Sequence, residues 1–489
     1  MSGITRRDFI KTSLGAAAAG SALLQACRSP RGATSTWSKP LGANDDVRIG
    51  VAGIRGKGNA HIQDFRRIPG VRVVALCDPD RRILAQRVQQ FAESKQQVAA
   101  YVDVRKMIDD AEVDAIVIAS PNHWHALMSV WACQAGKDVY VEKPCSHNVW
   151  EGRKIVEAAR KYGRIVQVGT QSRSDLALRE GIKYCQDGNL GKILLVRGLC
   201  YKPRGSIGKV SGPQFVPSYI DYDLWTGPAP LKPLMRTNLH YDWHWVWDTG
   251  NGDIGNQGIH QMDVCRWAAG AAQLSPRVMS VGGRFGYDDD GETPNTQFVF
   301  HDYDEIPILF EVRGLPVRKD GPGMPHYKGI RIGNVIHCEG GYFAGGFAYD
   351  NDGKKIKSFE IEQGSGHQAN FIEAVRSRRA SDLNADILEG HLSSALCHTG
   401  NISHLLGREA SPHEIHEQIK SEPEALETFE RFKEHLAANE VDITKTKATL
   451  GPWLKMNPEK ERFVGFGAAK ANRLLTRDYR QPYVVPKRV

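Results

Sequence analysis

The sequence of 489 residues contains no CxxC pair, although it has 9 cysteines. Because this number is odd and several cysteines lie in apolar stretches, the pattern argues against a disulfide framework. Cys77, Cys133, Cys200 and Cys265 are expected to be small buried hydrophobic residues of a protein that folds in a reducing compartment.

The sequence also has no basic stripe interleaved with aromatic residues, no internal repeat, and no membrane-length apolar run beyond its N-terminal leader. Lysine and arginine alternate with aspartate and glutamate along the chain, and part of the formal net charge of +8 lies in the leader. These absences argue against a nucleic-acid partner, a repeat architecture and a membrane-spanning protein.

The first residues have the pattern of an export signal. Arg6 and Arg7 form a twin-arginine motif, and a weakly apolar run rich in Ala and Gly follows over residues 13–24. This run is too short, and its side chains are too small, for a stable membrane span. Cys27 ends a stretch that resembles a lipobox, so the signal is removed either by simple cleavage or with lipid attachment at Cys27. A tether rich in Ser, Gly and Pro follows over residues 28–44.

A strand–loop–helix–strand pattern comes next. The apolar residues 47–52 predict a buried strand that runs directly into a glycine-rich loop over residues 53–58. An amphipathic helix and a second apolar strand over residues 71–77 follow, and this strand ends at Asp78. In dinucleotide-binding folds, a carboxylate about 20 residues beyond the loop binds the adenosine ribose, and the helix N-terminus binds the pyrophosphate.

These features predict a bound NAD. Asp78 disfavours the 2′-phosphate of NADP, although the neighbouring Arg81 and Arg82 leave NADP open. Arg55 occupies the position of the middle glycine, so either the turn is reshaped or the guanidinium contacts the phosphates. The expected cofactor contacts in this part are Gly53, Ile54, Arg55, Gly56, Gly58 and Asp78.

Strands and helices continue to alternate through residues 113–168, which predicts a doubly wound parallel sheet covered on both faces. Ligands bind beyond the carboxyl ends of such strands, where one strand ends at Ser120 and the next at Glu142. Burial there lowers the pKa of a lysine, which suits Lys143 for proton transfer. The expected cofactor contacts here are Ser120, Asn122, His125, Glu142 and Lys143. The pair His123 and His125 is interpreted as hydrogen-bonding rather than metal-binding.

The glycine-rich loop, the strand end at residues 119–125 and the motif at residues 142–144 occur in an order typical of one family. In these motifs the sequence resembles the Gfo/Idh/MocA oxidoreductases, which include glucose-fructose oxidoreductase and inositol dehydrogenase. Further likeness extends through residues 169–173, 225–228, 252–263 and 384–391, and so covers nearly the whole chain after the leader. The resemblance implies a second, α+β domain with a large, mostly antiparallel open sheet. It also implies hydride transfer at a sugar or polyol carbon.

By this resemblance, Lys143 matches the active-site lysine and His260 matches the acid/base histidine. Related dehydrogenases have an aspartate four residues before that histidine, where this sequence has Asn256. An amide cannot tune an imidazole as a carboxylate does, so the usual pair is incomplete. Asp253 or Asp263 is a candidate replacement.

Residues 240–247 are unusually aromatic and include His240, Trp243 and His244. Flat rings beside imidazoles suit a sugar, although the same tryptophans are equally consistent with the core of a sheet domain. His240 and His244 have the spacing of a helical zinc pair, but the intervening aromatic residues argue against a metal. The expected substrate contacts are Gln171, Arg173, Trp243, His244, Asn256 and His260, with no metal ligand.

Five segments are expected: a twin-arginine signal (1–32), a linker (33–44), an NAD(P)-binding Rossmann domain (45–168), a substrate-binding α+β domain (169–425) and a C-terminal tail or arm (426–489). A helix over residues 388–406 is expected to pack back on the Rossmann domain.

We expect a periplasmic enzyme: an exported NAD(P)-dependent oxidoreductase that forms a homo-oligomer and acts on a sugar, polyol or glycoside. Its cofactor is expected to be tightly bound and recycled, because no free nicotinamide pool is expected outside the cytosol. The alternatives are a glycosidase that works by oxidation, elimination, hydration and reduction, and a non-catalytic sugar or nucleotide sensor. Membrane contact is expected only through a lipid at Cys27.

Overall fold

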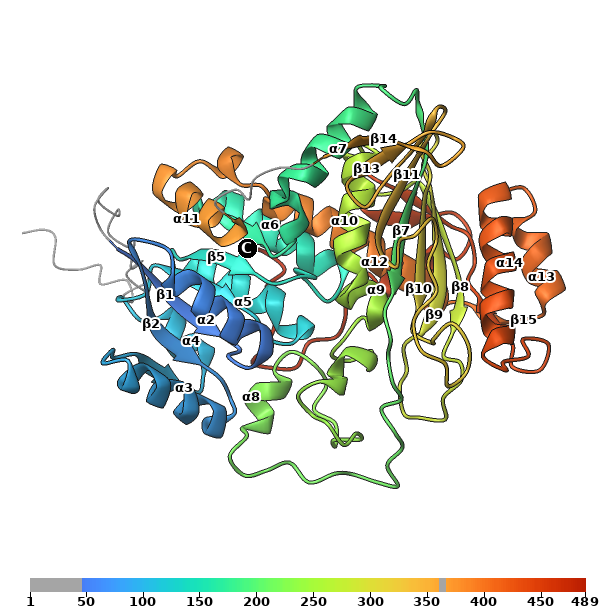
Figure 1. The fold of residues 1–489 in the computed structure, drawn as a ribbon. Coiled ribbons are helices and arrows are strands. Elements are labelled where there is room, and N and C mark those ends of the chain that lie inside the picture. Colours follow the sequence, from blue (N-terminus) through green and yellow to red (C-terminus); the bar gives the residue numbers. More distant parts are fainter. Residues whose placement is uncertain (1–45, 360–365) are drawn as a thin grey trace, which may run out of the picture. The chain divides into compact units, whose positions relative to one another are not determined.

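The computed structural model describes residues 46–359 and 366–489. The predicted export signal, Cys27 and the linker lie outside these residues. Two sheets and the helices around them make up the described part of the chain (Figure 1). No helix in this part is long and apolar enough to cross a membrane.

The first sheet has six strands, and all neighbouring strands in it are parallel. In spatial order they are β3 (Ala99–Tyr101), β2 (Val71–Cys77), β1 (Val47–Ala52), β4 (Ala115–Ile118), β5 (Asp138–Val141) and β6 (Val166–Val168). The strand order reverses between β1 and β4, which confirms the predicted doubly wound sheet. It also places the ligand crevice beyond the carboxyl ends of these two strands.

Helices cover both faces of the first sheet, and each face has its own apolar core. One core packs α4 (Val104–Ile108), α5 (Asn122–Gln134) and α6 (Val149–Tyr162) against the sheet. The other packs α2 (Gly56–Arg66), α3 (Arg81–Glu93) and α11 (His367–Ser377). Phe371 of α11 is fully buried in this second core, so a helix from late in the sequence completes the Rossmann fold.

The second sheet has 12 strands and is mostly antiparallel, which confirms the second half of the predicted fold class. Among its described strands, β7 and β10 form the parallel pair. In spatial order the strands are β14 (Lys355–Ser358), β13 (Phe347–Tyr349), β12 (Gly341–Ala344), β11 (Ile332–Cys338), β7 (Ile193–Tyr201), β10 (Ile308–Arg313), β9 (Thr296–Asp302), β8 (Arg277–Gly283), β16 (Ala448–Leu450) and β15 (Arg408–Ala410), while β17 (Leu454–Asn457) pairs with β8 and with β18 (Arg462–Val464).

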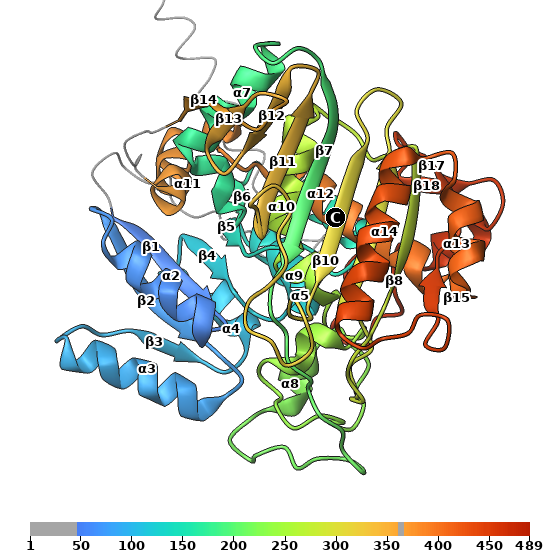
Figure 2. The same cartoon turned by 45° about the vertical axis from the view of Figure 1, so that its right-hand side comes forward.

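The two faces of the second sheet carry different helices (Figure 2). One face packs against α7 (Leu176–Gln186), α10 (Gly258–Ala268) and α12 (Ile387–Leu405), and the other against α13 (Pro412–Ile419) and α14 (Pro423–Ala438). Helix α12 also packs on α6 of the Rossmann domain, as predicted for residues 388–406. The remaining helices among the described residues are α8 (Tyr222–Thr226), α9 (Gly252–Asn256) and α15 (Ala468–Arg473), with 3-10 turns at Gln171–Ser174, Asp242–Trp245 and Ala380–Asp382.

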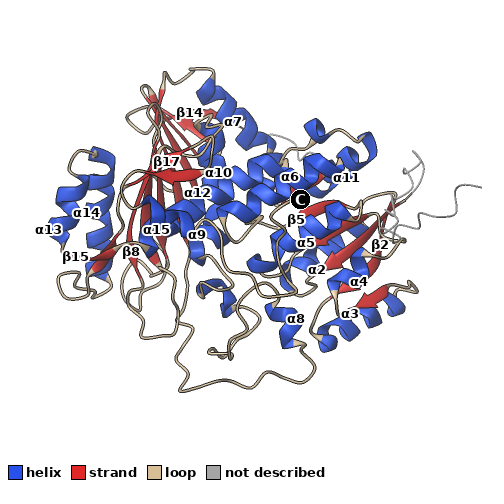
Figure 3. Cartoon of the chain, turned by 180° about the vertical axis from the view of Figure 1, so that it is seen from behind, coloured by secondary structure: helices blue, strands red, loops and turns tan. Residues whose placement is uncertain are grey.

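The structure differs from the predicted arm over residues 426–489. This stretch contains most of α14 together with β16, β17, β18 and α15, and both β16 and β17 pair with β8 (Figure 3). Leu450 and Leu454 are buried there, so apolar side chains hold the stretch in the sheet. The last residues then reach the first sheet's core, where Tyr483 and Val485 are buried.

Candidate active site

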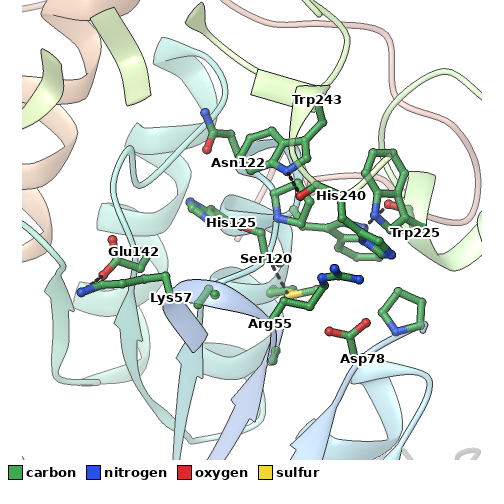
Figure 4. A pocket seen from close by; sticks show the side chains of 18 of the residues that line it. Arg55, Lys57, Asp78, Ser120, Asn122, His125, Glu142, Trp225, His240 and Trp243 are labelled. Atoms are coloured by element: carbon green, nitrogen blue, oxygen red, sulfur yellow. Dashed lines mark hydrogen bonds and ion pairs between the residues drawn. The ribbon is translucent and has the colours of Figure 1, made fainter. Parts of the chain in front are cut away.

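A cavity of about 710 Å³ lies beyond the carboxyl ends of β1, β2, β4 and β5. Figure 4 shows Arg55 and Asp78 on one side of it and Lys57 and Glu142 on the other. Its volume is in the range of small-molecule sites. Among the predicted site residues, the lining includes Gly53, Arg55, Gly56, Asp78, Ser120, Asn122, His125, Glu142, Lys143, Gln171, Trp243, His244, Asn256 and His260.

The glycine-rich loop between β1 and α2 leaves room for a phosphate group. Gly53 has φ +78°, and a Cβ there would lie 2.7 Å from the backbone of Ala119 and Ser120. A Cβ at Gly58 would lie 1.7 Å from the carbonyl oxygen of Gly53, whereas a Cβ at Gly56 would meet nothing within 4 Å. The open space at Gly56 and the unpaired amides of the first helical turn fit the pyrophosphate of a dinucleotide.

Two cations flank this first turn. Arg55 Nη1 lies 3.4 Å from Asp80 Oδ2. Lys57 Nζ lies 3.7 Å from Glu142 Oε1 on the opposite side and keeps a side-chain exposure of 46%. Arg55, which stands in place of the middle glycine, can therefore neutralise phosphate charge together with Lys57. Lys57 was not among the predicted contacts, although its place inside the glycine-rich loop was a signal.

Ile54 and Gly58 do not line the cavity, although both were expected to contact the cofactor. The Ile54 side chain is fully buried in the core on the α2 side of the sheet. Its N–H donates to Asp78 Oδ2 at 3.0 Å. Gly58 allows α2 to pack against the loop, so both residues act on the shape of the loop.

Asp78 stands at the end of β2, with its carboxylate held by backbone. Besides the bond from Ile54, the N–H of Asp80 donates to Asp78 Oδ1 at 3.0 Å. Burial raises the pKa of Asp78 to about 6, although these two bonds act in the opposite direction. Each oxygen keeps a second lone pair for a ribose hydroxyl, so the residues present fit the adenosine end of NAD.

We expect the affinity for NAD to fall as the pH decreases through about 6. Only the carboxylate form of Asp78 accepts both ribose hydroxyls, so the dissociation constant should rise by about tenfold for each pH unit below this pKa. Equilibrium titration followed by NADH fluorescence between pH 5 and 8 measures this dissociation constant. The Asp78→Asn variant should bind more weakly and show no such dependence, and an unchanged slope in that variant would exclude Asp78 as the titrating group.

Glu142 anchors the strand end that carries Lys143. His61 Nε2 lies 2.8 Å from Glu142 Oε1, the Gln171 side chain donates to the same oxygen at 3.1 Å, and the N–H of Lys143 donates to Oε2 at 3.2 Å. Burial alone would raise the pKa of Glu142, but His61, Lys57 and Lys143 hold it below its usual value. His61, a buried residue of α2, was not predicted, because a histidine on a helix face carries no distinct sequence signal.

The two histidines after β4 hold backbone in place. The ring nitrogens of His125 lie 2.6 Å from the carbonyl oxygen of Pro144 and 2.7 Å from that of Ser120. Those of His123 lie 3.3 Å from the carbonyl oxygen of Thr249 and 3.2 Å from that of Trp225. His125 therefore braces the turn that follows Lys143, and His123 joins the Rossmann domain to the walls of the cavity.

Lys143 projects from the end of β5 toward the second domain. Its Nζ donates to the carbonyl oxygen of Asn256 at 2.8 Å. Burial lowers the pKa of Lys143, and the charges of Lys57 and Lys202 act in the same direction, although Glu142 opposes them. A buried ammonium held by a neutral oxygen is well suited to exchange a proton with a bound hydroxyl group.

His260 lies on the first turn of α10, across from Lys143, and lines the cavity. Burial lowers the pKa of His260 to about 3, and the charge of Lys143 acts in the same direction. The imidazole is therefore neutral at ordinary pH, a form that can accept a proton.

Neither proposed replacement for the missing carboxylate is free to pair with His260. Arg204 donates to both oxygens of Asp253, at 2.9 Å and 2.7 Å. Arg173 Nε donates to Asp263 at 2.8 Å, and Ser393 donates to the same carboxylate at 2.6 Å. The Arg173 side chain is buried behind the cavity wall and does not line it. Arg173 was expected to bind substrate, but in the structure it forms a buried ion pair with Asp263.

The Asn256→Asp substitution should raise the pKa of His260, because a carboxylate beside an imidazole stabilises its charged form. The acidic limb of the pH–rate profile should move to higher pH, since protonated His260 cannot accept a proton. Nuclear magnetic resonance of labelled histidine measures the pKa directly. Gln257→Glu is the matched control, because Lys202 Nζ already contacts the Gln257 side chain at 2.8 Å and would neutralise the new charge. Equal shifts in the two variants would contradict a local effect.

Aromatic residues form the wall opposite the glycine-rich loop. Trp243 and His244 stack with ring centroids 3.6 Å apart, and Trp225 also lines the cavity. His244 Nδ1 lies 2.5 Å from the carbonyl oxygen of Tyr241. His240 points instead to Asp80, with Nε2 at 3.1 Å from Oδ2. Trp243 and His244 therefore face the cavity, while Trp225 and Trp243 also belong to a buried apolar cluster, so both interpretations of the aromatic segment apply in part. His240 lines the cavity as well and connects the second domain to the turn after β2.

Residues 47–170 match the model of an oxidoreductase family, GFO_IDH_MocA, that describes its NAD-binding Rossmann fold. Residues 193–310 match the model of the C-terminal alpha/beta domain of the same family. The chain belongs to the Gfo/Idh/MocA oxidoreductase family. Its first domain is thus the family's NAD-binding domain, and the site described above lies between that domain and the family's second domain.

Individual curated proteins match this chain over part of its length. A glycosyl hydrolase family 109 protein 2 from Shewanella sp. (strain ANA-3) is 35% identical over 173 residues, which cover 32% of this chain and 38% of that protein. Inositol 2-dehydrogenase from Salmonella typhimurium (strain LT2) is 33% identical over 159 residues, which cover 32% of this chain and 46% of that protein. The chain therefore spans less than half the length of these curated relatives.

The fold also matches a solved structure. WlbA dehydrogenase from Bordetella pertussis, in complex with NADH and UDP-GlcNAcA, superposes with a TM-score of 0.53 at 20% identity. The match covers 72% of this chain and 94% of that chain. It shows the shared two-domain fold.

Proposed function

We propose that this protein oxidises a hydroxyl-bearing carbon of a sugar, polyol or glycoside and reduces a second substrate, and that its NAD stays bound between these two half-reactions. One observation carries the second part: a loop of the second domain closes over the adenosine side of the cofactor cleft. The N–H of Arg81 donates to the carbonyl oxygen of Tyr219 at 2.9 Å, and that of Asp221 donates to the carbonyl oxygen of Pro79 at 3.0 Å. Together with the His240–Asp80 contact, these bonds hold the loop against the turn after β2, an arrangement that would slow the release of a bound dinucleotide.

The chain's own residues supply the proton chemistry of such a reaction. A bound nicotinamide ring supplies the acceptor and donor of a hydride. Lys143 Nζ binds the reacting hydroxyl and passes the single proton that this hydroxyl loses on oxidation to neutral His260. The stacked Trp243 and His244 offer a flat surface to the C–H face of a sugar ring.

Export is part of the proposal. The twin-arginine motif at Arg6 and Arg7 supports passage of a folded protein into the periplasm, with residues 1–32 as the signal. A protein that carries its cofactor through that route and regenerates it in the active site has no need of a free nicotinamide pool, which agrees with the loop contacts described above. Lipid attachment at Cys27 and self-association into a homo-oligomer belong to the same proposal, and intact-mass measurement and light scattering of the exported protein test them.

A second candidate is a glycosidase that works by oxidation, elimination, hydration and reduction. The name of the Shewanella relative favours it, as does a cleft that holds the cofactor for a reaction that restores it. In this route a hydroxyl group of the sugar is first oxidised to a ketone, and the carbon beside the ketone then loses a proton. The aglycone leaves, water adds in its place, and the ketone is reduced again. The net reaction is hydrolysis, with no net oxidation.

Proton nuclear magnetic resonance of a glycoside panel in heavy water separates these functions. Purified protein without added cofactor should bring its own NAD. Cleavage with deuterium at the carbon beside the oxidised one supports the glycosidase. Formation of a keto-sugar without cleavage, in step with reduction of an added carbonyl compound, supports the oxidoreductase with a retained cofactor. A keto-sugar that forms together with NADH only when NAD is supplied indicates instead a dehydrogenase that exchanges its cofactor. The Lys143→Met variant is the control and should be silent in both assays.

Absence of both products across sugars, polyols and glycosides, with NAD and ligand binding intact, would overturn the enzymatic proposal. It would favour the sensor instead. In that case calorimetric titration with the same panel should still give binding.

A further inference from the structure

The last residues of the chain form a strap, defined here as residues 474–489, that runs across the Rossmann domain. Near its start, the N–H of Trp150 on α6 donates to the carbonyl oxygen of Leu475 at 2.9 Å. Further on, the Tyr479 hydroxyl donates to Glu151 at 2.9 Å. At its end, Lys161 contacts the backbone oxygen of Val489. The strap is thus fixed to α6 at both ends.

Between these points, the strap binds α8 of the second domain through one carboxylate. Arg480 Nη1 donates to Asp223 Oδ1 at 2.5 Å, and the Tyr483 hydroxyl donates to Asp223 Oδ2 at 2.9 Å. Arg480 also donates to the carbonyl oxygens of Asp223, at 2.9 Å, and Gly227, at 3.1 Å. Both oxygens of Asp223 and the end of α8 are therefore held by the strap.

Helix α8 is a wall of the cofactor cavity. Leu224 and Trp225, the two residues after Asp223, line the cavity. Trp124 of α5 lies between this wall and the strap: its Nε1 donates to the carbonyl oxygen of Trp225 at 3.0 Å, and its ring meets the Tyr483 ring edge-on at 5.4 Å. The position of α8 thus depends on contacts from the chain's last residues.

We propose that Asp223, gripped by Arg480 and Tyr483, positions α8 against the bound cofactor and sets how long NAD stays in the cleft. This inference rests on the proposed function, because it concerns the retention of the same cofactor. The residues have no contact with the cavity themselves, so they act through Leu224 and Trp225. Loss of the contacts between Asp223 and the strap lets α8 move away from the Rossmann domain. The cleft then opens next to the loop that carries Tyr219 and Asp221.

The experiment measures the dissociation rate of NADH from the full-length protein. Protein loaded with NADH is mixed rapidly with excess NAD, and the loss of bound-NADH fluorescence is followed. Asp223→Asn removes the charge that Arg480 grips, and Tyr483→Phe removes one hydroxyl while it keeps the ring on Trp124. We expect dissociation to be faster by about two- to fivefold in Asp223→Asn, because the Asp223 side chain is 53% exposed and an ion pair in such a setting contributes modestly, and by less in Tyr483→Phe.

Lys161→Met is the matched control, because it loosens the strap's end without touching α8. Its dissociation rate should equal that of the wild type, and the thermal unfolding midpoints of all three variants should agree. An unchanged dissociation rate in Asp223→Asn would overturn the inference, and so would an equal increase in Lys161→Met. If the wild type itself releases NADH within milliseconds, the retained-cofactor part of the proposed function fails, while the ratio of the variant rates still decides the role of the strap.

Discussion

Replacement of Lys143 by methionine should lower the turnover number by about 10²–10⁴-fold, the range expected for loss of a positioned acid–base group. Methionine keeps much of the side-chain volume but removes the ammonium that donates to the carbonyl oxygen of Asn256. Because Lys143 lies away from the Asp78 side of the cavity, NADH binding should be retained. Steady-state kinetics on the substrate found by nuclear magnetic resonance measures the turnover number, and NADH titration measures the affinity for the cofactor.

Lys57→Met provides a matched comparison within the same cavity. Lys57 belongs to the first turn of α2, and its ammonium lies 3.7 Å from Glu142. Loss of this cation should weaken cofactor binding by removing charge near the pyrophosphate. Turnover at saturating cofactor should fall much less than in Lys143→Met, because burial lowers the pKa of Lys143 more than Lys57 does. If Lys143→Met instead weakened NADH binding with normal turnover, Lys143 would be a cofactor anchor and the assigned chemistry would be wrong.

Replacement of Arg173 by methionine should lower the free energy of unfolding by about 3–5 kcal/mol, because it leaves a buried carboxylate without its partner. Burial alone would raise the pKa of Asp263, but Arg173 holds it below its usual value. The charge is therefore present in the folded protein at neutral pH. Denaturant unfolding followed by tryptophan fluorescence measures the loss.

The double variant Arg173→Met/Asp263→Leu is the control, because it removes both charges together. Its stability should recover toward that of the wild type, since apolar pairs often replace buried ion pairs without loss. A substrate-binding role for Arg173 would have a different signature: a higher KM with unchanged stability. That outcome would contradict the buried placement of Arg173.

Much of the cofactor half was predictable from local sequence. Alternation of apolar strands and amphipathic helices depends on residues within one element, so the doubly wound sheet followed from periodicity. The ends of β2 and β5 place Asp78 and Lys143 at the cavity for the same reason. In a parallel sheet, the residue that follows a strand lies at the ligand edge.

The partners of these residues were not predictable in the same way. The sequence-based interpretation assigned Arg173 to substrate and left Asp263 as a candidate partner of His260. The structure pairs these two with each other across 90 positions. His240 was considered as a zinc ligand and instead meets Asp80 at a separation of 160 positions. No local pattern records such pairs, because the packing of α10 and of the loop before it decides them.

The sequence by itself determined the dinucleotide fold, its glycine-rich turn and the strand-end positions of Asp78 and Lys143, because short-range periodicity and backbone geometry decide these features. Only the tertiary structure decided which charges neutralise one another, which aromatic side chains face the cavity, and how residues 426–489 return to both sheets. These depend on the burial of groups from distant segments against each other. In a buried setting, a charge needs a specific partner, and that partner is chosen by three-dimensional packing.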